Sequence, residues 1–420
     1  MMIASKRMII YVLLLCYLAI SIMDRMNMSV AGSSIAAEWH LTPTGLGYLF
    51  SSFFWIYIIC LLPAGALTDR LGSRRTAAWA MGLWSVFQMC TGLALGLTSM
   101  IFTRLGLGVF ETAQNPVANL VIRQWAPRSE RAFATSVWSI GNPAGSAFGA
   151  LFVAWLVSTV GWRVSFIATG LIGLAWMLTW LLLFRLPEHA GWVGERERAK
   201  IVAERDLDLE SAAETAPGMG FRGLLATRTM WGMAITQGCS TYVTYFLLTW
   251  LPGYMQMSRG LSIMGSGVYT ALPFAGAMIF SLLLSHLCDR MLDQSKVPGG
   301  QRRYAVAIGS LATAVVLLVP FASSLGMAVV LLTISITFTT STQTWNFALV
   351  NDLLEGGADV GRATACLTVG GNAFGLLAPI ITGYVVSATG SFTIPFVLCG
   401  MLAVAGAVCV LSVVRNAIGK

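Results

Sequence analysis

Long apolar stretches follow one another along most of this chain of 420 residues. The first runs from Met8 to Met23 without a charged residue. Hydrophobic residues make up 56% of the chain and charged residues 10%, whereas soluble domains carry roughly 25% charged residues. The runs do not alternate between polar and apolar residues, as the strands of a membrane barrel do. We therefore expect an all-α membrane protein, with room for about twelve spanning helices.

The apolar runs also set the approximate limits of each span. The expected spans cover residues 8–30, 45–67, 75–97, 99–123, 132–159, 162–184, 229–256, 262–288, 302–322, 325–350, 360–388 and 392–414. One long polar interruption separates the sixth span from the seventh. We therefore expect an N-terminal bundle over 1–184, a cytoplasmic linker over 185–228 and a C-terminal bundle over 229–420. The middle of the linker, 194–214, is expected to form an amphipathic helix on the membrane surface.

The basic residues indicate the orientation in the membrane. Of 26 Lys and Arg residues, Arg25 and Arg104 lie well inside spans, and Arg163 and Arg259 fall in or next to the loops of one side. The others lie at the termini, or in or next to the loops of the opposite side. Cytoplasmic loops carry the excess of Lys and Arg, so both termini are expected in the cytoplasm. The net charge of +8 is thus explained by topology and does not indicate a nucleic-acid partner.

Landmarks recur in the same order in the two halves of the sequence. The first half carries Gly65-Ala-Leu-Thr-Asp69-Arg70-Leu-Gly72-Ser-Arg74-Arg75, Arg131-Ala132 and Gly141-Asn142, and the second half carries Asp289-Arg290, Arg362-Ala363 and Gly371-Asn372. This order predicts two parallel, pseudo-symmetric six-helix bundles, which in transporters rock about a substrate held at the midplane. Glycines 141, 145 and 149 are spaced for close helix approach in the fifth span.

Four charged residues fall inside the expected spans. Asp24 and Arg25 follow the first apolar run, and Arg104 and Glu111 lie two helical turns apart on one face of the fourth span. Intramembrane charges are costly and usually functional, and they persist when paired. An entering carboxylate would compete for a guanidinium, and the carboxyl group so released should take up a proton. The alternatives are that Arg25 only reaches the lipid headgroups and that Arg104 and Glu111 form a structural ion pair.

The loop between the second and third spans carries a resemblance to a known family. Gly65-x-x-x-Asp69-Arg70-x-Gly72-x-Arg74-Arg75 resembles the signature loop of the major facilitator superfamily. Further stretches resemble its anion:cation symporters, which include bacterial sugar-acid/proton symporters and animal sialic-acid and vesicular glutamate carriers. These stretches are Asp24-Arg25-x-Asn27-x-Ser29-x-Ala31, Arg104-x-Gly106-x-Gly108-x-x-Glu111, Trp125-x-Pro127-x-x-Glu130-Arg131-Ala132, Trp250-Leu251-Pro252-x-Tyr254 and Asn372-x-x-Gly375-x-x-x-Pro379.

The resemblance implies roles for individual residues. Asp24 and Glu111 would carry protons, Arg25 would bind the substrate carboxylate, and Arg104 would pair with the acids. Tyr57, Asn142 and Asn372 would line the cavity. Sugar-acid carriers often have glutamine where this chain has Asn142, so the resemblance does not decide the identity of the substrate. Residues of the loop and of its counterparts would control the conformational cycle, with a purely topological role as the alternative: Gly65, Asp69, Arg70, Gly72, Arg74, Arg75, Glu130, Arg131, Asp289 and Arg290.

Other polar and aromatic residues of the second half are weaker candidates for the cavity wall. They are Tyr242, Tyr245, Gln343 and Trp345. An intramembrane tyrosine such as Tyr57 can instead be a packing residue, and an asparagine can instead join helices. The eight cysteines are dispersed through apolar runs, which predicts neither disulfides nor a metal site.

The sequence therefore predicts a secondary transporter and no enzyme. It carries no phosphate-binding loop, so we expect a proton gradient as the energy source and no cofactor. Away from the span ends, the spans of the second half contain no arginine, which favours an organic monoanion such as a sugar acid as the substrate. We expect the transporter to be a monomer in the bacterial inner membrane. The alternatives are a symporter for aromatic, small hydroxy or dicarboxylic acids, an exporter, and a membrane sensor that does not transport.

Overall fold

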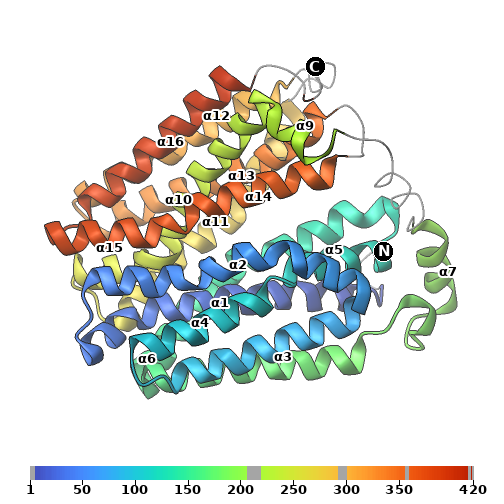
Figure 1. Ribbon diagram of the computed structural model, residues 1–420, viewed down its shortest axis with the longest axis horizontal. Coiled ribbons are helices and arrows are strands. Elements are labelled where there is room, and N and C mark those ends of the chain that lie inside the picture. The colour runs from blue at the N-terminus through green and yellow to red at the C-terminus, as the bar shows by residue number, and fades with distance from the viewer. Residues whose placement is uncertain (1–4, 206–218, 292–299, 355–358, 415–417, 419–420) are drawn as a thin grey trace. The chain divides into compact units, whose positions relative to one another are not determined.

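The computed structural model describes residues 5–205, 219–291, 300–354, 359–414 and 418. The side chains of Leu62 and Asp289 lie outside that description. Within the described residues the regular elements are helices, apart from one isolated parallel bridge between Leu354 and Ile418 (Figure 1). The expected all-α class is confirmed.

The helices follow the apolar runs closely. The first half contains α1 (Met8–Trp39), α2 (Pro43–Leu71), α3 (Ser73–Gly92), α4 (Leu97–Glu111), α5 (Gln114–Trp125), η1 (Arg128–Glu130), α6 (Arg131–Leu183), η2 (Pro187–His189) and α7 (Glu195–Glu204). The second half contains α9 (Gly220–Ala226), α10 (Arg228–Met257), α11 (Ile263–Met291), α12 (Arg302–Thr313), η4 (Ala314–Phe321), α13 (Leu325–Leu353), α14 (Val360–Gly375), α15 (Leu377–Thr389) and α16 (Thr393–Val413).

Each expected span coincides with one helix or with consecutive helices in the described part of the chain. The fifth and sixth spans run together as α6, with non-helical backbone at Gly161, where φ is 83°. The fourth span is divided into α4 and α5, and each part is too short to cross a bilayer alone. Eight stretches among the described residues are long and apolar enough to cross a membrane by length and composition alone.

Polar side chains mark the starts of several helices. The Thr227 hydroxyl accepts a hydrogen bond from the Met230 amide at the start of α10, at 3.3 Å. The Ser324 hydroxyl does the same for the Met327 amide at the start of α13, at 3.2 Å. These side chains satisfy amide groups that have no partner within the helix.

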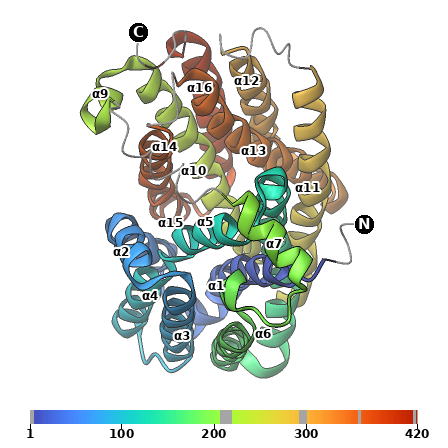
Figure 2. The same cartoon turned by 90° about the vertical axis from the view of Figure 1, so that its right-hand side faces the viewer.

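The described chain forms two compact units. Unit 1 comprises residues 1–35 and 52–211, and unit 2 comprises residues 36–51 and 212–420. In unit 1, α3 packs against α4 and α6, and in unit 2, α10 packs against α14 and α16 while α13 packs against α11 and α12 (Figures 1 and 2). The domain limits expected from the sequence, 1–184, 185–228 and 229–420, stay a prediction.

A stripe of glycines on α6 fixes the position of α1 in unit 1. A Cβ atom added at Gly141 would come within 2.7 Å of the Leu15 carbonyl oxygen, and one at Gly145 within 2.6 Å of the Ala19 carbonyl oxygen. The two backbones are therefore in contact along this stripe, as the glycine spacing predicts. Because Asp24 and Arg25 follow on the same helix, this contact also fixes their position along α6.

A second close approach lies in unit 2, between the start of α2 and α15. A Cβ atom at Gly47 would lie 2.6 Å from the Pro379 carbonyl oxygen, and one at Gly383 would lie 2.5 Å from the Pro43 carbonyl oxygen. The hydroxyl groups of Tyr48 and Tyr384 meet at 2.7 Å beside this crossing. Only glycine at both positions allows the helices to approach this closely.

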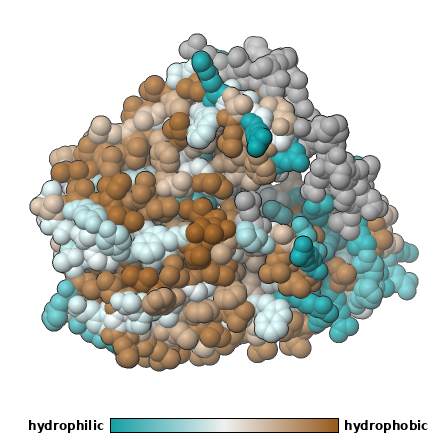
Figure 3. Space-filling view, in the orientation of Figure 1, coloured by the Kyte–Doolittle hydropathy of each residue, from teal (hydrophilic) through white to brown (hydrophobic). Residues whose placement is uncertain are grey.

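The exterior of the helices is largely apolar. Leu182, Phe148 and Ile59 are 77%, 69% and 69% exposed. Figure 3 shows apolar residues over much of one face, whereas hydrophilic residues gather around α7. An exposed apolar surface of this extent marks contact with a membrane or with another protein. This surface and the long apolar helices are typical of a multi-pass membrane protein.

Candidate functional site

The charged residues of α1 and α4 meet inside unit 1. The Arg25 guanidinium donates to one Glu111 oxygen, Oε1, from Nε at 2.9 Å and from Nη2 at 2.6 Å. The Ser21 hydroxyl donates to the same oxygen. Glu111 is fully buried. A buried charge of this kind is stable because it is paired and hydrogen-bonded.

Asp24 lies beside this pair but is held by a neutral donor. The Trp84 indole Nε1 donates to Asp24 Oδ2 at 3.1 Å, whereas Oδ1 has no hydrogen-bond partner among the described residues. The Trp84 ring stacks on Tyr17, with ring centroids 5.3 Å apart. Asp24 is only 1% exposed, so it is a buried carboxyl group with one open oxygen.

Arg104 differs from the arrangement that the family resemblance implies. It is 3% exposed, and its Nε and Nη1 have no hydrogen-bond partner within the described part of the chain. Seven residues put Arg104 and Glu111 on one face of α4 but about 10 Å apart along its axis. Arg25 reaches Glu111 from α1 instead. The proton-coupling role of Arg104 stays a prediction.

Aromatic rings of α2 surround the Arg25 guanidinium. Its Cζ atom lies 4.7 Å from the ring centroid of Phe53, 5.6 Å from that of Tyr57 and 5.8 Å from that of Phe54. Tyr57 is therefore close to the charged residues, and it is 5% exposed. Its role as a cavity residue stays a prediction. Asn142, on α6, is exposed.

A neutral polar group extends from the charged residues of unit 1. Asn27 Nδ2 and Gln88 Nε2 donate to the Thr169 hydroxyl at 3.1 and 3.0 Å, and the Ser165 hydroxyl donates to Asn27 Oδ1 at 2.8 Å. All four residues are fully buried. The sequence interpretation missed Gln88, Ser165 and Thr169. Their signal would be polar residues at helical spacing within apolar runs, because Gln88 lies four residues after Trp84, and Ser165 and Thr169 are four residues apart on α6.

The candidate residues of unit 2 form a neutral cluster. The Tyr245 hydroxyl donates to Asn372 Oδ1 at 2.6 Å, and Asn372 Nδ2 donates to the Thr368 carbonyl at 2.9 Å. Gln343 Nε2 donates to the Thr244 hydroxyl at 2.9 Å. The structure thus brings Tyr245 and Asn372 together.

The other unit 2 candidates are more deeply packed. Trp345 lies in an apolar core with Val306 and Leu349. The Tyr242 side chain is 3% exposed, and its hydroxyl group has no hydrogen-bond partner among the described residues. Asn346 and Gln237, which the sequence interpretation missed, join α13 to α10 through a hydrogen bond of 3.0 Å.

The signature loop joins α2 to α3. Asp69, Arg70 and Arg75 are exposed and Gly65 is half-buried, whereas Arg74 Nη2 donates to the Leu181 carbonyl at 2.7 Å. Gly72 has a φ of 75°, a left-handed conformation that favours glycine. Arg290 is exposed near the end of α11, and the side chain of Asp289 lies outside the described residues. The conformational roles of these residues stay predictions.

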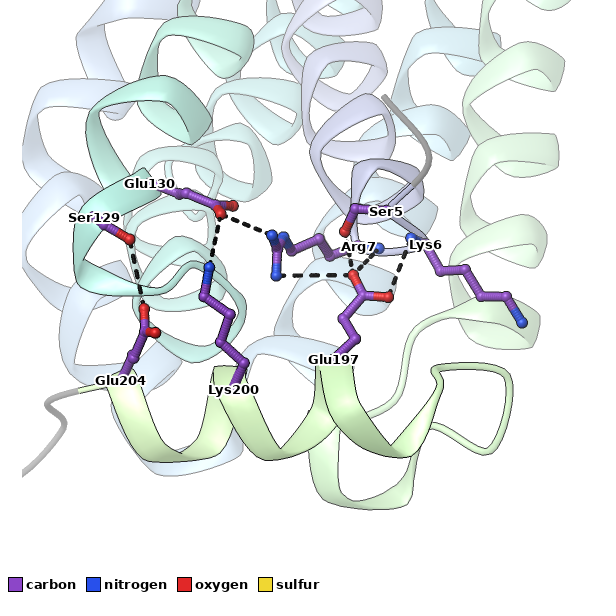
Figure 4. A network of polar contacts seen from close by, with 8 residues as sticks. All are labelled: Ser5, Lys6, Arg7, Ser129, Glu130, Glu197, Lys200 and Glu204. Carbon is purple, nitrogen blue, oxygen red and sulfur yellow. Dashed lines mark hydrogen bonds and ion pairs between the residues drawn. The ribbon is translucent and has the colours of Figure 1, made fainter. Parts of the chain in front are cut away.

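Glu130 belongs to a charged network that Figure 4 shows. It immediately precedes α6, which begins at Arg131. Glu130 Oε1 accepts from Arg7 Nη2 at 2.7 Å and from Lys200 Nζ at 3.4 Å. This contact ties the start of α1 and the start of α6 to α7.

Glu197 of α7 caps α1 from outside that helix. Its carboxylate accepts from the backbone amides of Lys6 and Arg7 at 3.3 and 3.2 Å and from the Ser5 hydroxyl (Figure 4). A negative charge at a helix N-terminus is favourable. The helix expected over 194–214 is confirmed for Glu195–Glu204, and the part from 206 onward lies outside the described residues.

Comparison with known proteins decides the family. The model of the Major Facilitator Superfamily matches residues 13–357. The chain belongs to the major facilitator superfamily. The resemblance of its signature loop to that superfamily is therefore confirmed, as is its fold of two six-helix bundles.

Relatives within the superfamily align over nearly the whole chain. A probable L-galactonate transporter of Escherichia coli (strain K12) is 30% identical over 98% of this chain and 91% of its own length. A probable galactarate/D-glucarate transporter of the same strain is 27% identical over 98% of this chain and 95% of its own.

A solved structure supports the same fold. It is a bacterial homologue of the human lysosomal transporter Spinster, crystallised in an inward-facing and occupied conformation, with a TM-score of 0.72. The match covers 97% of this chain and 95% of that chain at 18% sequence identity. At this identity the likeness carries the major facilitator fold alone.

Proposed function

We propose that this protein imports an organic monocarboxylate of the sugar-acid class by symport with protons. The observation that carries the proposal is the buried Arg25–Glu111 ion pair, with Asp24 beside it and held by a neutral donor. The names of the relatives, which are transporters of galactonate and of galactarate or glucarate, support the substrate class.

The proposed coupling is an exchange of partners at Arg25. A substrate carboxylate can take the planar guanidinium in two parallel hydrogen bonds and so displace Glu111. A carboxylate that loses its paired cation in a buried site favours its protonated form. Substrate and proton would then bind together, and this coupling is reciprocal by linkage. The open oxygen of Asp24 provides a second position for a proton.

The neutral residues of unit 2 are candidates for recognising the hydroxyl groups of a sugar acid. Asn372, Tyr245 and Gln343 offer amide and hydroxyl groups, which can exchange their internal hydrogen bonds for bonds to substrate hydroxyls. No group of unit 2 needs to change its charge in this scheme. Alternating access to the two sides of the membrane would complete the cycle.

A dicarboxylic sugar acid is a second candidate substrate. Arg104 is a second buried guanidinium in unit 1, with open donors at Nε and Nη1 among the described residues. The galactarate/D-glucarate relative supports this alternative. We place either transporter in the bacterial inner membrane with both termini in the cytoplasm, because the basic residues gather on one side.

Reconstitution tests the proposal directly. The purified protein is placed in proteoliposomes with an internal pH dye, and D-galactonate, L-galactonate, D-glucarate and an aromatic acid are added in turn. We expect internal acidification with an aldonate and none with Arg25→Ala. Acidification with D-glucarate alone would favour the dicarboxylate. Absence of acidification with every acid, with the protein folded, would contradict proton symport of this class.

A further inference from the structure

One buried ring in unit 1 contacts two guanidinium groups. Phe53 of α2 is fully buried. Its ring centroid lies 4.7 Å from Arg25 Cζ and 5.3 Å from Arg104 Cζ. The two arginines come from α1 and α4, so three helices meet at this ring.

The contacts matter because the two guanidiniums carry the same charge. Arg25 is balanced by Glu111, but two of the donors of Arg104 have no partner among the described residues. Buried charges without partners are strongly destabilising. The face of an aromatic ring attracts a cation, and the attraction grows when water is excluded. Phe53 therefore offsets part of the cost of keeping both arginines in this site.

The position of Phe53 is fixed by its neighbours. A Cβ atom added at Gly108 would lie 2.6 Å from the Phe53 carbonyl oxygen, so α4 is in direct contact with α2 here. The Phe53 ring meets Phe54 edge-on at 5.0 Å and lies 5.3 Å from the ring of Tyr57. With its backbone and its ring both in contact with neighbours, Phe53 can act as a fixed reference for flexible arginine side chains.

We propose that Phe53 is a positioning residue for anion binding, whose ring holds Arg25 and Arg104 together as one divided anion site. In this arrangement Arg25 is oriented toward Glu111, and Arg104 keeps its open donors available for an incoming anion. The inference rests on the proposed function in taking that anion to be the transported substrate. It adds an aromatic residue that has no charge and no hydrogen-bonding group.

Transport kinetics test the role in binding. Phe53→Leu keeps the residue apolar but removes the ring, and it should raise the KM for the transported acid about tenfold with kcat within about twofold, as the loss of desolvated cation–π contacts would. Phe53→Tyr keeps an aromatic ring and should have the KM of the wild type. Phe54→Leu is the matched control, because Phe54 contacts Arg25 at 5.8 Å and is expected to have a smaller effect. Equal loss of kcat in Phe53→Leu and Phe53→Tyr would indicate a packing role and overturn the proposal.

A second measurement does not depend on transport. Thermal unfolding of the purified protein is compared for the wild type, Phe53→Leu, Arg104→Met and the double variant. If the ring holds Arg104, removal of Arg104 should be less destabilising once Phe53 is leucine, so the two effects should not add. Additive effects would overturn the shared ring even if transport is observed. If the wild type transports none of the tested acids, the proposed function is contradicted. Non-additive effects of Phe53→Leu and Arg104→Met on unfolding would still support the role of the Phe53 ring.

Discussion

The polar clusters within the two units differ in charge. In unit 1 an ion pair, a second carboxyl group and a second guanidinium lie within the apolar helices. In unit 2 the corresponding cluster is built from amides and hydroxyl groups, and the Tyr245 hydroxyl donates to the Asn372 side chain. Charged groups can couple binding to protonation, whereas neutral groups can recognise shape and hydroxyls without changing charge. The difference suggests that energy coupling belongs to unit 1 and that unit 2 contributes to substrate recognition.

The largest effect is expected from the central cation of unit 1. Arg25→Ala removes the proposed carboxylate ligand and leaves Glu111 buried without its guanidinium. Removing one partner of a buried, hydrogen-bonded charge pair at a binding site costs about 2–5 kcal/mol, so affinity should fall at least about 30-fold. Binding of D-galactonate to purified protein, measured by calorimetry, checks this. Arg222→Ala, at an exposed arginine of α9, is the control, and wild-type affinity in Arg25→Ala would remove this residue from the site.

The next effect separates transport from its energy source. Glu111→Gln keeps the shape of the side chain but cannot release a proton. We expect loss of proton-driven accumulation while exchange of labelled substrate across the membrane continues. Proteoliposome uptake with and without a pH gradient measures both activities. Glu204→Gln changes an acid of α7 elsewhere in unit 1 and should leave both intact. Unchanged accumulation in Glu111→Gln would refute its role in coupling.

A change in unit 2 should affect recognition alone. Tyr245→Phe removes the hydroxyl group that donates to Asn372. One neutral hydrogen bond contributes about 0.5–1.5 kcal/mol, so the KM should rise by roughly two- to tenfold. The number of protons carried with each substrate should stay the same. A change in that number would break the division of roles between the units, and Tyr384→Phe on α15 serves as the matched control.

The helices could be predicted from the sequence because their signals are local. Apolar run length and the distribution of Lys and Arg depend on nearby residues, and the glycine stripe at 141, 145 and 149 follows from helical spacing. The grouping of Asp24, Arg25, Arg104 and Glu111 in one half was also predictable, because intramembrane charges are conspicuous.

The partners within that group could not be predicted in the same way. The spacing on α4 pointed to Arg104 as the partner of Glu111, yet Glu111 forms its ion pair with Arg25 of another helix, α1. Ser21, Phe53 and Trp84 are common residue types in membrane helices, so nothing in the sequence distinguishes them. Their roles depend on which faces of α1, α2, α3 and α4 meet, and that is a property of packing between helices.

The smallest effect is expected on stability, from acidic residues outside the spans. Each unit has a carboxylate there that holds the local structure through hydrogen bonds. In unit 2, Asp359 accepts from Arg362 Nη1 at 2.8 Å and from the backbone amides of Met219 and Gly220 at 2.6 and 3.3 Å. The Arg362 guanidinium and these amides lower the pKa of Asp359 below its ordinary value of 3.8. In unit 1, hydrogen bonding to Arg205 likewise lowers the pKa of Glu188.

A lowered pKa in the folded state fixes the direction of the pH dependence. The contribution of Asp359 to stability is fully present above the pKa of the unfolded chain and is lost as the pH falls through the lower pKa of the folded state. Asp359→Asn should therefore lower the thermal unfolding midpoint at pH 7 by about 2 °C, and the difference from the wild type should shrink below pH 3.8. Scanning fluorimetry across this range, with Glu188→Gln as the counterpart in unit 1, checks the sign. A difference that stays constant with pH would mean that the charge of Asp359 does not hold α9, and that the two units do not share this use of a carboxylate.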